Sequence, residues 1–328
     1  MNQSPVSRRR LLSGTAGTIA ALIATSACGG ERSTGDSDRY KGGRLSIATG
    51  NTTGVYYQLG GGYADLIGKH LDGYQATAEA TAASVENLQR VVRGDSDIAF
   101  TLADSAADAA LGSGAFRSPQ PIRALARIYN NFTHVVALRE AKITSVAGMR
   151  GKRVSTGGPN SGTENIAFRL LEVAGLKPDV DIQKQALSLP ETVQGMKDGT
   201  LDALFWSGGL PTPGITDLVT SLKDDVVFLP LDSMLAPLQK KYGEIYLPDT
   251  LGKDVYQLPA DVSTIAVPNL LVVSEEMPDD LAYDLTKLLF ERQTDLAKVH
   301  PEGKNISRDV ASKTEPVRLH PGAAKYLG

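Results

Sequence analysis

Hydrophobic positions along the chain alternate between a period of two and a period near 3.6 residues, which predicts strands alternating with helices. Leu59, Tyr63, Leu66 and Ile67 show the helical pattern, because they stand at i, i+4, i+7 and i+8. Strands are predicted at residues 45–48, 74–81, 98–100, 122–129, 134–138, 152–156, 182–187, 201–206, 226–231 and 262–273. Helices are predicted at residues 59–67, 84–94, 104 onward, 166–175, 190–197, 213–222 and 278–296. Ser84 is the expected N-cap of the second helix.

This repetition of β-α-β units indicates an α/β protein with two mostly parallel sheets and right-handed crossovers. Two long β-rich runs, at residues 129–138 and 265–273, are the expected chain crossings between two lobes, a two-strand hinge. Lobe I would then be discontinuous, comprising residues 40–133 plus 268–328. Lobe II would comprise residues 134–267.

Residues 1–27 have the order of an export signal, with a basic head, an apolar middle and small residues at the end. The head SRRRLL is close to the twin-arginine form, whose cargo crosses the membrane already folded. A transmembrane anchor is the alternative. Residues 11–27 are shorter than the roughly 20 apolar residues that a spanning helix needs, and they are too polar.

Cys28, the only cysteine, stands at the end of this segment in TSACG, which looks like a bacterial lipobox. The lipobox pattern prefers Leu where this chain has Thr25. A lone cysteine in an exported chain cannot close an internal disulfide, so we expect Cys28 to be lipidated rather than a buried structural thiol. Residues 28–43, rich in Gly, Ser and charged residues, would be a flexible tether to the outer face of the membrane.

The formal net charge of −3 becomes more negative once Arg8, Arg9 and Arg10 are removed with the signal. A mildly acidic surface argues against nucleic acid as a partner. No segment after residue 28 is apolar for long enough to span a membrane. We therefore expect a monomer that is water-soluble after its tether and contacts the membrane only through its lipid.

The sequence contains few candidate catalytic residues. Its histidines, His70, His134, His300 and His320, are widely separated, and Cys28 is the only thiol. No zinc-binding His or Cys pairs and no Gly-x-Ser-x-Gly elbow are present. We expect no catalytic residues, no metal and no cofactor.

Two glycine-rich turns each follow a strand and precede a helix: residues 48–57 (ATGNTTGVYY) and residues 155–164 (STGGPNSGTE). Glycine lets backbone N–H groups approach a ligand, and a helix N-terminus carries unpaired donors that attract anions. Ligands in open parallel sheets lie beyond the carboxyl ends of strands, where both turns would fall. Ordinary βα turns are the alternative. Neither turn has the spacing of a nucleotide-binding loop.

Several motifs in a fixed order resemble the solute receptors of TAXI-type TRAP transporters. They are IATGNTTGVYYQLGG, ASVENLQRVVRGDSDIAF, GKRVSTGGPNSGTE, DALFWSGGLPTPGITDL, DVSTIAVPNLLVV and LHPGAAKY. The resemblance covers nearly everything from residue 44 onward. It implies a type II periplasmic-binding-protein fold without catalysis. It also implies delivery of a small carboxylate, such as glutamate, glutamine or 2-oxoglutarate, to a TRAP membrane permease.

The resemblance also assigns ligand-binding positions. In lobe I they are Thr49, Asn51, Thr52, Gly54, Tyr56, Tyr57, Ser84 and Asp104. In lobe II they are Gly158, Asn160, Ser161, Gly162, Thr163, Trp206 and Ser207. The three aromatic side chains could line the ligand's carbon chain or be core residues. Asp104 could meet an α-ammonium group or cap a helix. Arg127 and His134 are additional candidate charges or structural residues.

Two rival functions share these features: a binding module that feeds a membrane sensor, and an exported enzyme on the same scaffold.

Overall fold

The computed structural model describes Tyr40 and residues 43–328. The predicted export signal and Cys28 lie outside the described residues, as does almost all of the tether. Among the residues that are described, none of the helices has both the length and the apolarity needed to cross a bilayer.

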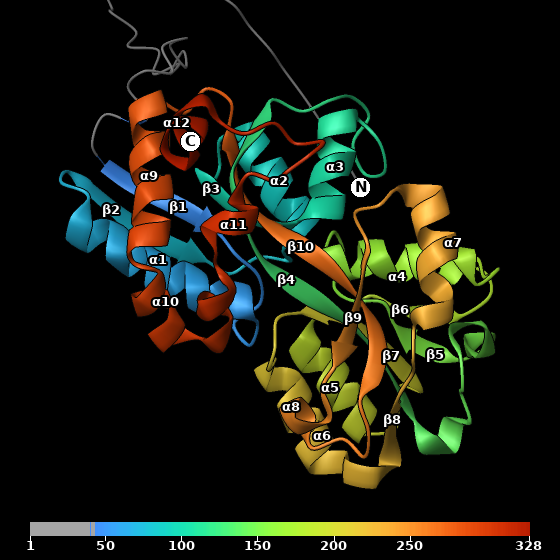
Figure 1. The fold of residues 1–328 in the computed structure, drawn as a ribbon. Helices are drawn as coiled ribbons and strands as arrows, with labels where there is room; N and C mark the ends of the chain where they lie inside the picture. The colour runs from blue at the N-terminus through green and yellow to red at the C-terminus, as the bar shows by residue number, and fades with distance from the viewer. Residues whose placement is uncertain (1–39, 41–42) are drawn as a thin grey trace, which may run out of the picture. The chain divides into compact units, whose positions relative to one another are not determined.

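Ten strands form one hydrogen-bonded sheet (Figure 1), in the order β2-β1-β3-β10-β4-β7-β5-β6, with β8 paired to β4 and β9 paired to β10. The strands are β1 Gly43–Ala48, β2 Tyr74–Glu79, β3 Ile98–Leu102, β4 Ile122–Leu138, β5 Arg153–Ser155, β6 Gln183–Gln185, β7 Ala203–Gly208, β8 Val226–Phe228, β9 Leu247–Leu251 and β10 Val262–Ser274. The predicted α/β class is confirmed, but the strands of the two predicted sheets belong to one continuous sheet. The groups β2-β1-β3 and β7-β5-β6 pair in parallel, and the antiparallel strands β10 and β4 join them.

Strand β4 runs through 17 residues, although the hydrophobic pattern predicted two strands separated at residues 130–133. The polar side chains Asn130 and Asn131 interrupt the pattern, but their backbone pairs with Pro268 and Val267 of β10. The register shifts between Pro268 and Leu270, which accommodates a proline that has no N–H to donate.

The helices are α1 Val55–His70, α2 Ser84–Arg93, α3 Ala103–Leu111, α4 Gly162–Val173, α5 Leu189–Lys197, α6 Pro213–Leu222, α7 Asp232–Tyr242, α8 Lys253–Tyr256, α9 Asp279–Glu291, α10 Gln293–Val299, α11 Arg308–Ala311 and α12 Pro321–Leu327. The single helix predicted at 278–296 is instead two helices that meet at Arg292. Their main neighbours differ, because α9 packs chiefly against α12, whereas α10 packs chiefly against residues 301–305.

Ser84 is not the N-cap of α2, contrary to the sequence prediction. Ala83 holds that position with a φ of 85°, and Ser84 is the first helical residue. The Ser84 hydroxyl instead accepts a hydrogen bond from the backbone N–H of Leu102, at 3.0 Å. This bond ties the start of α2 to the end of β3.

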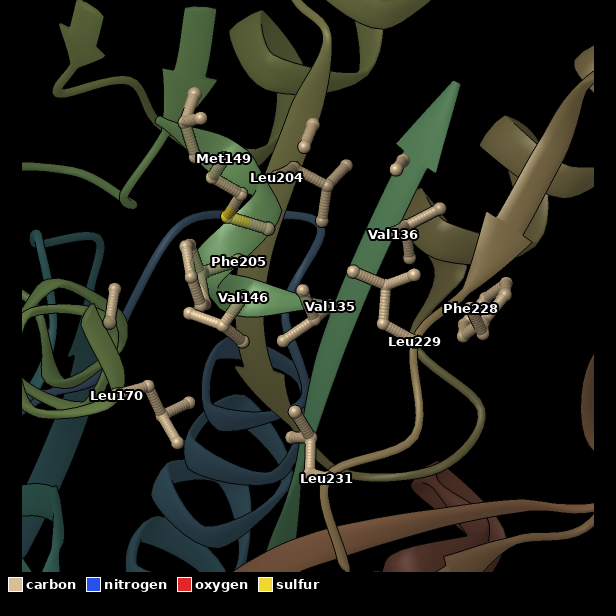
Figure 2. Packing of buried hydrophobic residues seen from close by; sticks show 14 of the residues in the cluster. Val135, Val136, Val146, Met149, Leu170, Leu204, Phe205, Phe228, Leu229 and Leu231 are labelled. Atoms are coloured by element: carbon tan, nitrogen blue, oxygen red, sulfur yellow. The ribbon is translucent and has the colours of Figure 1, made fainter. Parts of the chain in front are cut away.

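Buried hydrophobic residues separate into a core of residues 135–267, which Leu102 joins, and cores built from residues 40–129 and 270–323. Figure 2 shows side chains of the first core, where Val146, Met149 and Phe205 lie close together. We call the part around this core lobe II, and the part around the other cores lobe I. The predicted limits at residues 133/134 and 267/268 stay predictions.

Candidate functional site

A cavity of about 300 Å³ is lined by residues from both lobes. Its walls come from the N-terminal turns of four helices and from the end of β7. The lining residues are Gly50, Asn51, Gly54, Val55, Tyr56, Thr81, Ala82, Ala83, Ser84, Leu102, Asn131, Gly158, Pro159, Ser161, Gly162, Thr163, Ala186, Ser188, Leu189, Glu191, Trp206, Ser207, Gly208 and Gly209.

The four helices are α1 and α2 from lobe I and α4 and α5 from lobe II, with 16, 10, 12 and 9 residues. Each helix N-terminus carries a partial positive charge and backbone N–H donors. In the part of the chain that the structure describes, the lining contains no Lys, Arg or His, and Glu191 is its one charged side chain. The positive partial charges at this cavity therefore come from backbone dipoles.

The first glycine-rich turn is shaped by Asn51. Its Oδ1 accepts hydrogen bonds from the Thr53 backbone N–H at 3.1 Å and from the Thr53 hydroxyl at 2.8 Å. The Gly54 N–H donates to the Asn51 carbonyl at 3.0 Å, and Gly54 is the N-cap of α1. This local bonding closes the turn and directs the start of α1 at the cavity.

The second turn requires left-handed backbone at Gly157 and Asn160, with φ of 91° and 61°. A Cβ on Gly157 would lie 2.6 Å from Thr163 Cγ2, so only glycine fits there. The Ser161 hydroxyl caps α4 by accepting from the Glu164 N–H at 3.0 Å.

The end of β7 closes the cavity. The Ser207 N–H donates to Thr163 Oγ1 at 3.2 Å, and the Ser207 carbonyl accepts from Asn131 Nδ2 at 3.3 Å. Ser207 Oγ is buried without a hydrogen-bond partner, although the residue lines the cavity. Trp206 is oriented by its Nε1–H, which donates to Thr212 Oγ1 at 3.0 Å.

Most of the predicted site residues come together in this cavity. The ten that line it are Asn51, Gly54, Tyr56, Ser84, Gly158, Ser161, Gly162, Thr163, Trp206 and Ser207. Their contact with a ligand stays a prediction.

Five predicted residues do not line the cavity. Thr49 is buried and donates its hydroxyl proton to the Glu79 carbonyl at 2.6 Å. Thr52 is exposed and Tyr57 is half-buried. Asn160 and Asp104 line a different cavity, which also contains Arg169.

Asp104 is engaged with side chains from lobe II. The Tyr246 hydroxyl donates to Asp104 Oδ2 at 3.0 Å, and Arg169 Nη1 lies 3.7 Å from the same oxygen. Burial raises the pKa of Asp104, while the charge of Arg169 opposes this rise in part. The structure gives Asp104 a protein partner in the place of an α-ammonium group.

Arg127 and His134 also lie outside the cavity lining. The Arg127 side chain donates to Asn130 Oδ1 at 3.1 Å. His134 is fully buried, with Nδ1 2.9 Å from the Phe132 carbonyl and Nε2 3.1 Å from the Tyr256 hydroxyl. Burial lowers the pKa of His134 to about 4, which keeps the ring neutral near pH 7.

Sequence reasoning missed the turn that starts α5. Ser188 and Glu191 line the cavity and form a capping box, in which each side chain bonds the other's backbone. The spacing Ser-x-x-Glu before a hydrophobic run is a signal that could have identified this fourth N-terminus. Asn131 gave no such signal, because it lies within a strand.

Among the described residues, no group of three or more His, Cys, Asp or Glu side chains is arranged to hold a metal ion. Anions are the ligands that this arrangement of helix ends favours.

A family model described as the NMT1-like family matches residues 47–328. The chain belongs to the NMT1-like family.

Two solved structures share the type II periplasmic-binding-protein fold with this NMT1-like chain. One similar structure is a binding protein component of an ABC phosphonate transporter from Pseudomonas aeruginosa. It has a TM-score of 0.53 and 12% identity, over 81% of this chain and 80% of that chain. Another is PhnD1 from Prochlorococcus marinus (MIT 9301) in complex with methylphosphonate. It has a TM-score of 0.52 and 12% identity, over 80% of this chain and 90% of that chain. At this identity the similarity concerns the fold.

Proposed function

We propose that the chain is an extracytoplasmic solute-binding receptor of a TAXI-type TRAP transporter. It binds a small carboxylate between its two lobes and delivers it to a membrane permease, without catalysis and without a cofactor. The order of motifs described under Sequence analysis supports the TRAP assignment, and the fold is one used by solute-binding proteins.

The convergence of four helix N-termini on one cavity carries this proposal. Each helix end stabilises an anion by about 0.3–1 kcal/mol, and a hydrogen bond to a charged group contributes about 1.5–3 kcal/mol net. Three or four such contacts reach the roughly 8 kcal/mol of micromolar binding. A carboxylate needs no lysine or arginine here, because the backbone dipoles replace them.

The apolar part of the lining fits the carbon chain of such a ligand. Val55, Tyr56, Leu102, Leu189 and Trp206 all contribute to the cavity wall. Aromatic rings offer large apolar faces while their polar atoms keep hydrogen-bond partners, as Tyr56 and Trp206 do here.

Binding would favour the closed arrangement of the lobes. The Glu86 N–H of α2 donates to the Asn160 carbonyl of lobe II at 3.1 Å, so the lobes touch beside the cavity. A solute that contacts both lobes stabilises this state by the contacts it makes only there. The permease would then recognise the closed form.

The receptor would be lipid-anchored outside the cytoplasm. The predicted signal and Cys28 supply this part of the proposal. Replacement of Cys28 by Ser should move the protein from the membrane fraction to the soluble fraction and leave solute binding unchanged. Retention of C28S in the membrane fraction would contradict lipidation at this residue.

Thermal-shift measurements on the purified protein test the proposal. Glutamate, glutamine and 2-oxoglutarate form the carboxylate panel, and methylphosphonate is included because a structural relative binds it. We expect at least one carboxylate to raise Tm. Indifference to every carboxylate would overturn the ligand class, and a response to methylphosphonate alone would replace it with phosphonates. Consumption of a ligand would favour the enzyme alternative. Binding of the ligand-loaded protein to a membrane sensor would favour the sensing alternative.

A further inference from the structure

A cluster of charged and polar side chains joins the two lobes beside the cavity. Asp104 and Asp108 come from α3 in lobe I, and Arg169 comes from α4 in lobe II. Arg169 Nη2 forms an ion pair with Asp108 Oδ2, and Arg169 Nη1 donates to the Tyr246 hydroxyl at 2.6 Å. Tyr246 in turn donates to Asp104 Oδ2 at 3.0 Å.

This cluster is largely removed from solvent. The side chains of Asp104 and Arg169 are 0% and 10% exposed, and the Tyr242 ring covers Arg169 at 4.6 Å from its centroid. Asn165 of α4 adds longer contacts, with Nδ2 3.4 Å from Asp104 Oδ2 and 3.3 Å from Asp108 Oδ2. Removing one partner from such a buried ion pair leaves the other charge unpaired, which is strongly unfavourable.

The cluster and the cavity share one helix. The N-terminal residues Ser161, Gly162 and Thr163 line the cavity, and Asn165 and Arg169 follow on the same helix one and two turns later. A displacement of α4 from α3 would therefore move an N-terminus away from the solute. Separation of the lobes would break the ion pairs between Arg169 and the two aspartates, which links the cluster to the closed state.

We propose that Arg169 is a positioning residue for solute binding: it clasps α4 to Asp104 and Asp108 of α3 and thereby holds the α4 N-terminus at the cavity. Arg169 does not touch the solute. The inference rests on the proposed function, and it attributes part of the protein's affinity for its solute to a side chain outside the cavity.

Arg169→Met is the main test, because methionine keeps the packing volume along the stem and removes every ion pair. Asp108→Asn is a milder second variant that keeps the shape of the cluster. Arg153→Met is the matched control, since Arg153 pairs with Asp202 at 2.6 Å and both residues belong to lobe II. Dissociation constants for 2-oxoglutarate and glutamate are measured by calorimetry.

We expect Arg169→Met to weaken binding at least tenfold and Asp108→Asn to weaken it severalfold. Arg153→Met should change binding less than twofold, even where it lowers Tm as much. Binding by Arg169→Met equal to that of the unchanged protein would overturn the proposal, and so would equal losses in the Arg169 and Arg153 variants.

A second measurement needs no solute. Spin labels at Leu111 of lobe I and Val180 of lobe II, which are 63% and 75% exposed, report the distance between the lobes. The labelled protein carries Cys28→Ser, so that only the introduced cysteines react. We expect Arg169→Met to give longer and broader distances than Arg153→Met. Unchanged distances would overturn the proposed role of Arg169 even if no carboxylate binds. The absence of binding by the unchanged protein contradicts only the proposed function.

Discussion

Ser207 and Thr156 each bury a hydroxyl that has no hydrogen-bond partner in the structure. Ser207 lines the cavity and Thr156 does not. A buried, unsatisfied hydroxyl is unfavourable unless a ligand completes its hydrogen bonding. This difference makes the Ser207 hydroxyl a donor available to a bound anion.

Ser207→Ala should therefore weaken binding of the carboxylate that gives the largest thermal shift. A hydrogen bond to a charged group contributes about 1.5–3 kcal/mol, so the dissociation constant should rise roughly tenfold or more. The stability without ligand should stay the same or increase, because an unpaired polar group is removed. Calorimetric titration and urea unfolding measure the two effects.

Thr156→Ala provides the control, because it removes the same kind of hydroxyl from the second glycine-rich turn outside the lining. It should leave the dissociation constant within about twofold, far below the tenfold change expected for a hydrogen bond to a charged group. If both variants lose affinity equally, the effect comes from the turn and not from the Ser207 hydroxyl.

His134 makes stability depend on pH. Its pKa falls from an ordinary 6.5 to about 4 on burial, so the unfolded chain binds a proton that the folded chain does not bind between these values. The folded state is therefore destabilised as the pH falls from about 6.5 to 4, by about 3 kcal/mol in full. Above pH 6.5 this contribution is constant.

His134→Gln should flatten this dependence, because glutamine does not titrate. The buried His300 and His320, whose pKa values are also lowered by burial, act in the same direction and remain in the variant. Urea unfolding at pH 7 and at pH 4.5 in both proteins measures the difference. An identical loss of unfolding free energy between the two pH values would rule out His134 as a source.

At the scale of elements, the two glycine-rich turns allowed the sequence to predict half of the site. Gly54 and Gly162 mark where α1 and α4 begin, and both turn out to line one cavity. The α2 contribution was predicted at Ser84 for the wrong reason, because its hydroxyl bonds Leu102 instead of capping the helix. Helix α5 was predicted, but its start was not predicted to belong to the site, since nothing local indicates that Ser188 lies near residues more than a hundred positions away.

Helices α2 and α4 approach each other through Gly162. A Cβ built on Gly162 would lie 2.5 Å from Ser84 Oγ and 2.6 Å from Leu102 Cδ1. Gly162 has no positive φ, so alanine fits its backbone, and the nearest clashes arise from Ser84 of α2 and Leu102 of β3. Gly162→Ala should therefore leave each lobe folded and hinder closure, raising the dissociation constant at least tenfold in a calorimetric titration.

Gly61→Ala is the matched control, since a Cβ there meets nothing within 4 Å in the middle of α1. This substitution should leave binding unchanged and raise the free energy of unfolding by up to about 1 kcal/mol, the helix propensity difference. Full affinity in Gly162→Ala would show that α2 and α4 do not need their close approach.

At the scale of the whole molecule, contacts between distant parts of the chain were beyond sequence reasoning. The sequence alone predicts that Asp104 either contacts a ligand or caps a helix, because its partners Arg169 and Tyr246 lie on other elements. The crossing strands were predicted from their β-rich composition, but not the polar network between them. Hydrophobic periodicity predicts which face of a helix or strand is buried. It does not predict which side chains pair across the lobes, because that pairing depends on the fold.

The crossing of β4 and β10 is connected to the cavity through Asn269. This fully buried amide accepts a hydrogen bond from the Tyr56 hydroxyl of α1. Its Nδ2 donates to the Tyr129 carbonyl at 3.1 Å and to Asn131 Oδ1 at 2.9 Å. Tyr56 and Asn131 both line the cavity, so Asn269 fixes two walls from the strand on which the lobes join.

Asn269→Ala should lower both stability and affinity, because it removes Asn269 as the partner of the Tyr56 hydroxyl and of Asn131 Oδ1. An unsatisfied buried group costs about 1–3 kcal/mol, so urea unfolding should show a loss in that range. Asn130→Ala is the comparison, since Asn130 is a half-buried neighbour whose side chain accepts from Arg127. It should cost less than about 1 kcal/mol and leave binding unchanged. Equal stability in the two variants would mean that the crossing is held by its backbone ladder alone, and that Asn269 does not couple the hinge to the cavity.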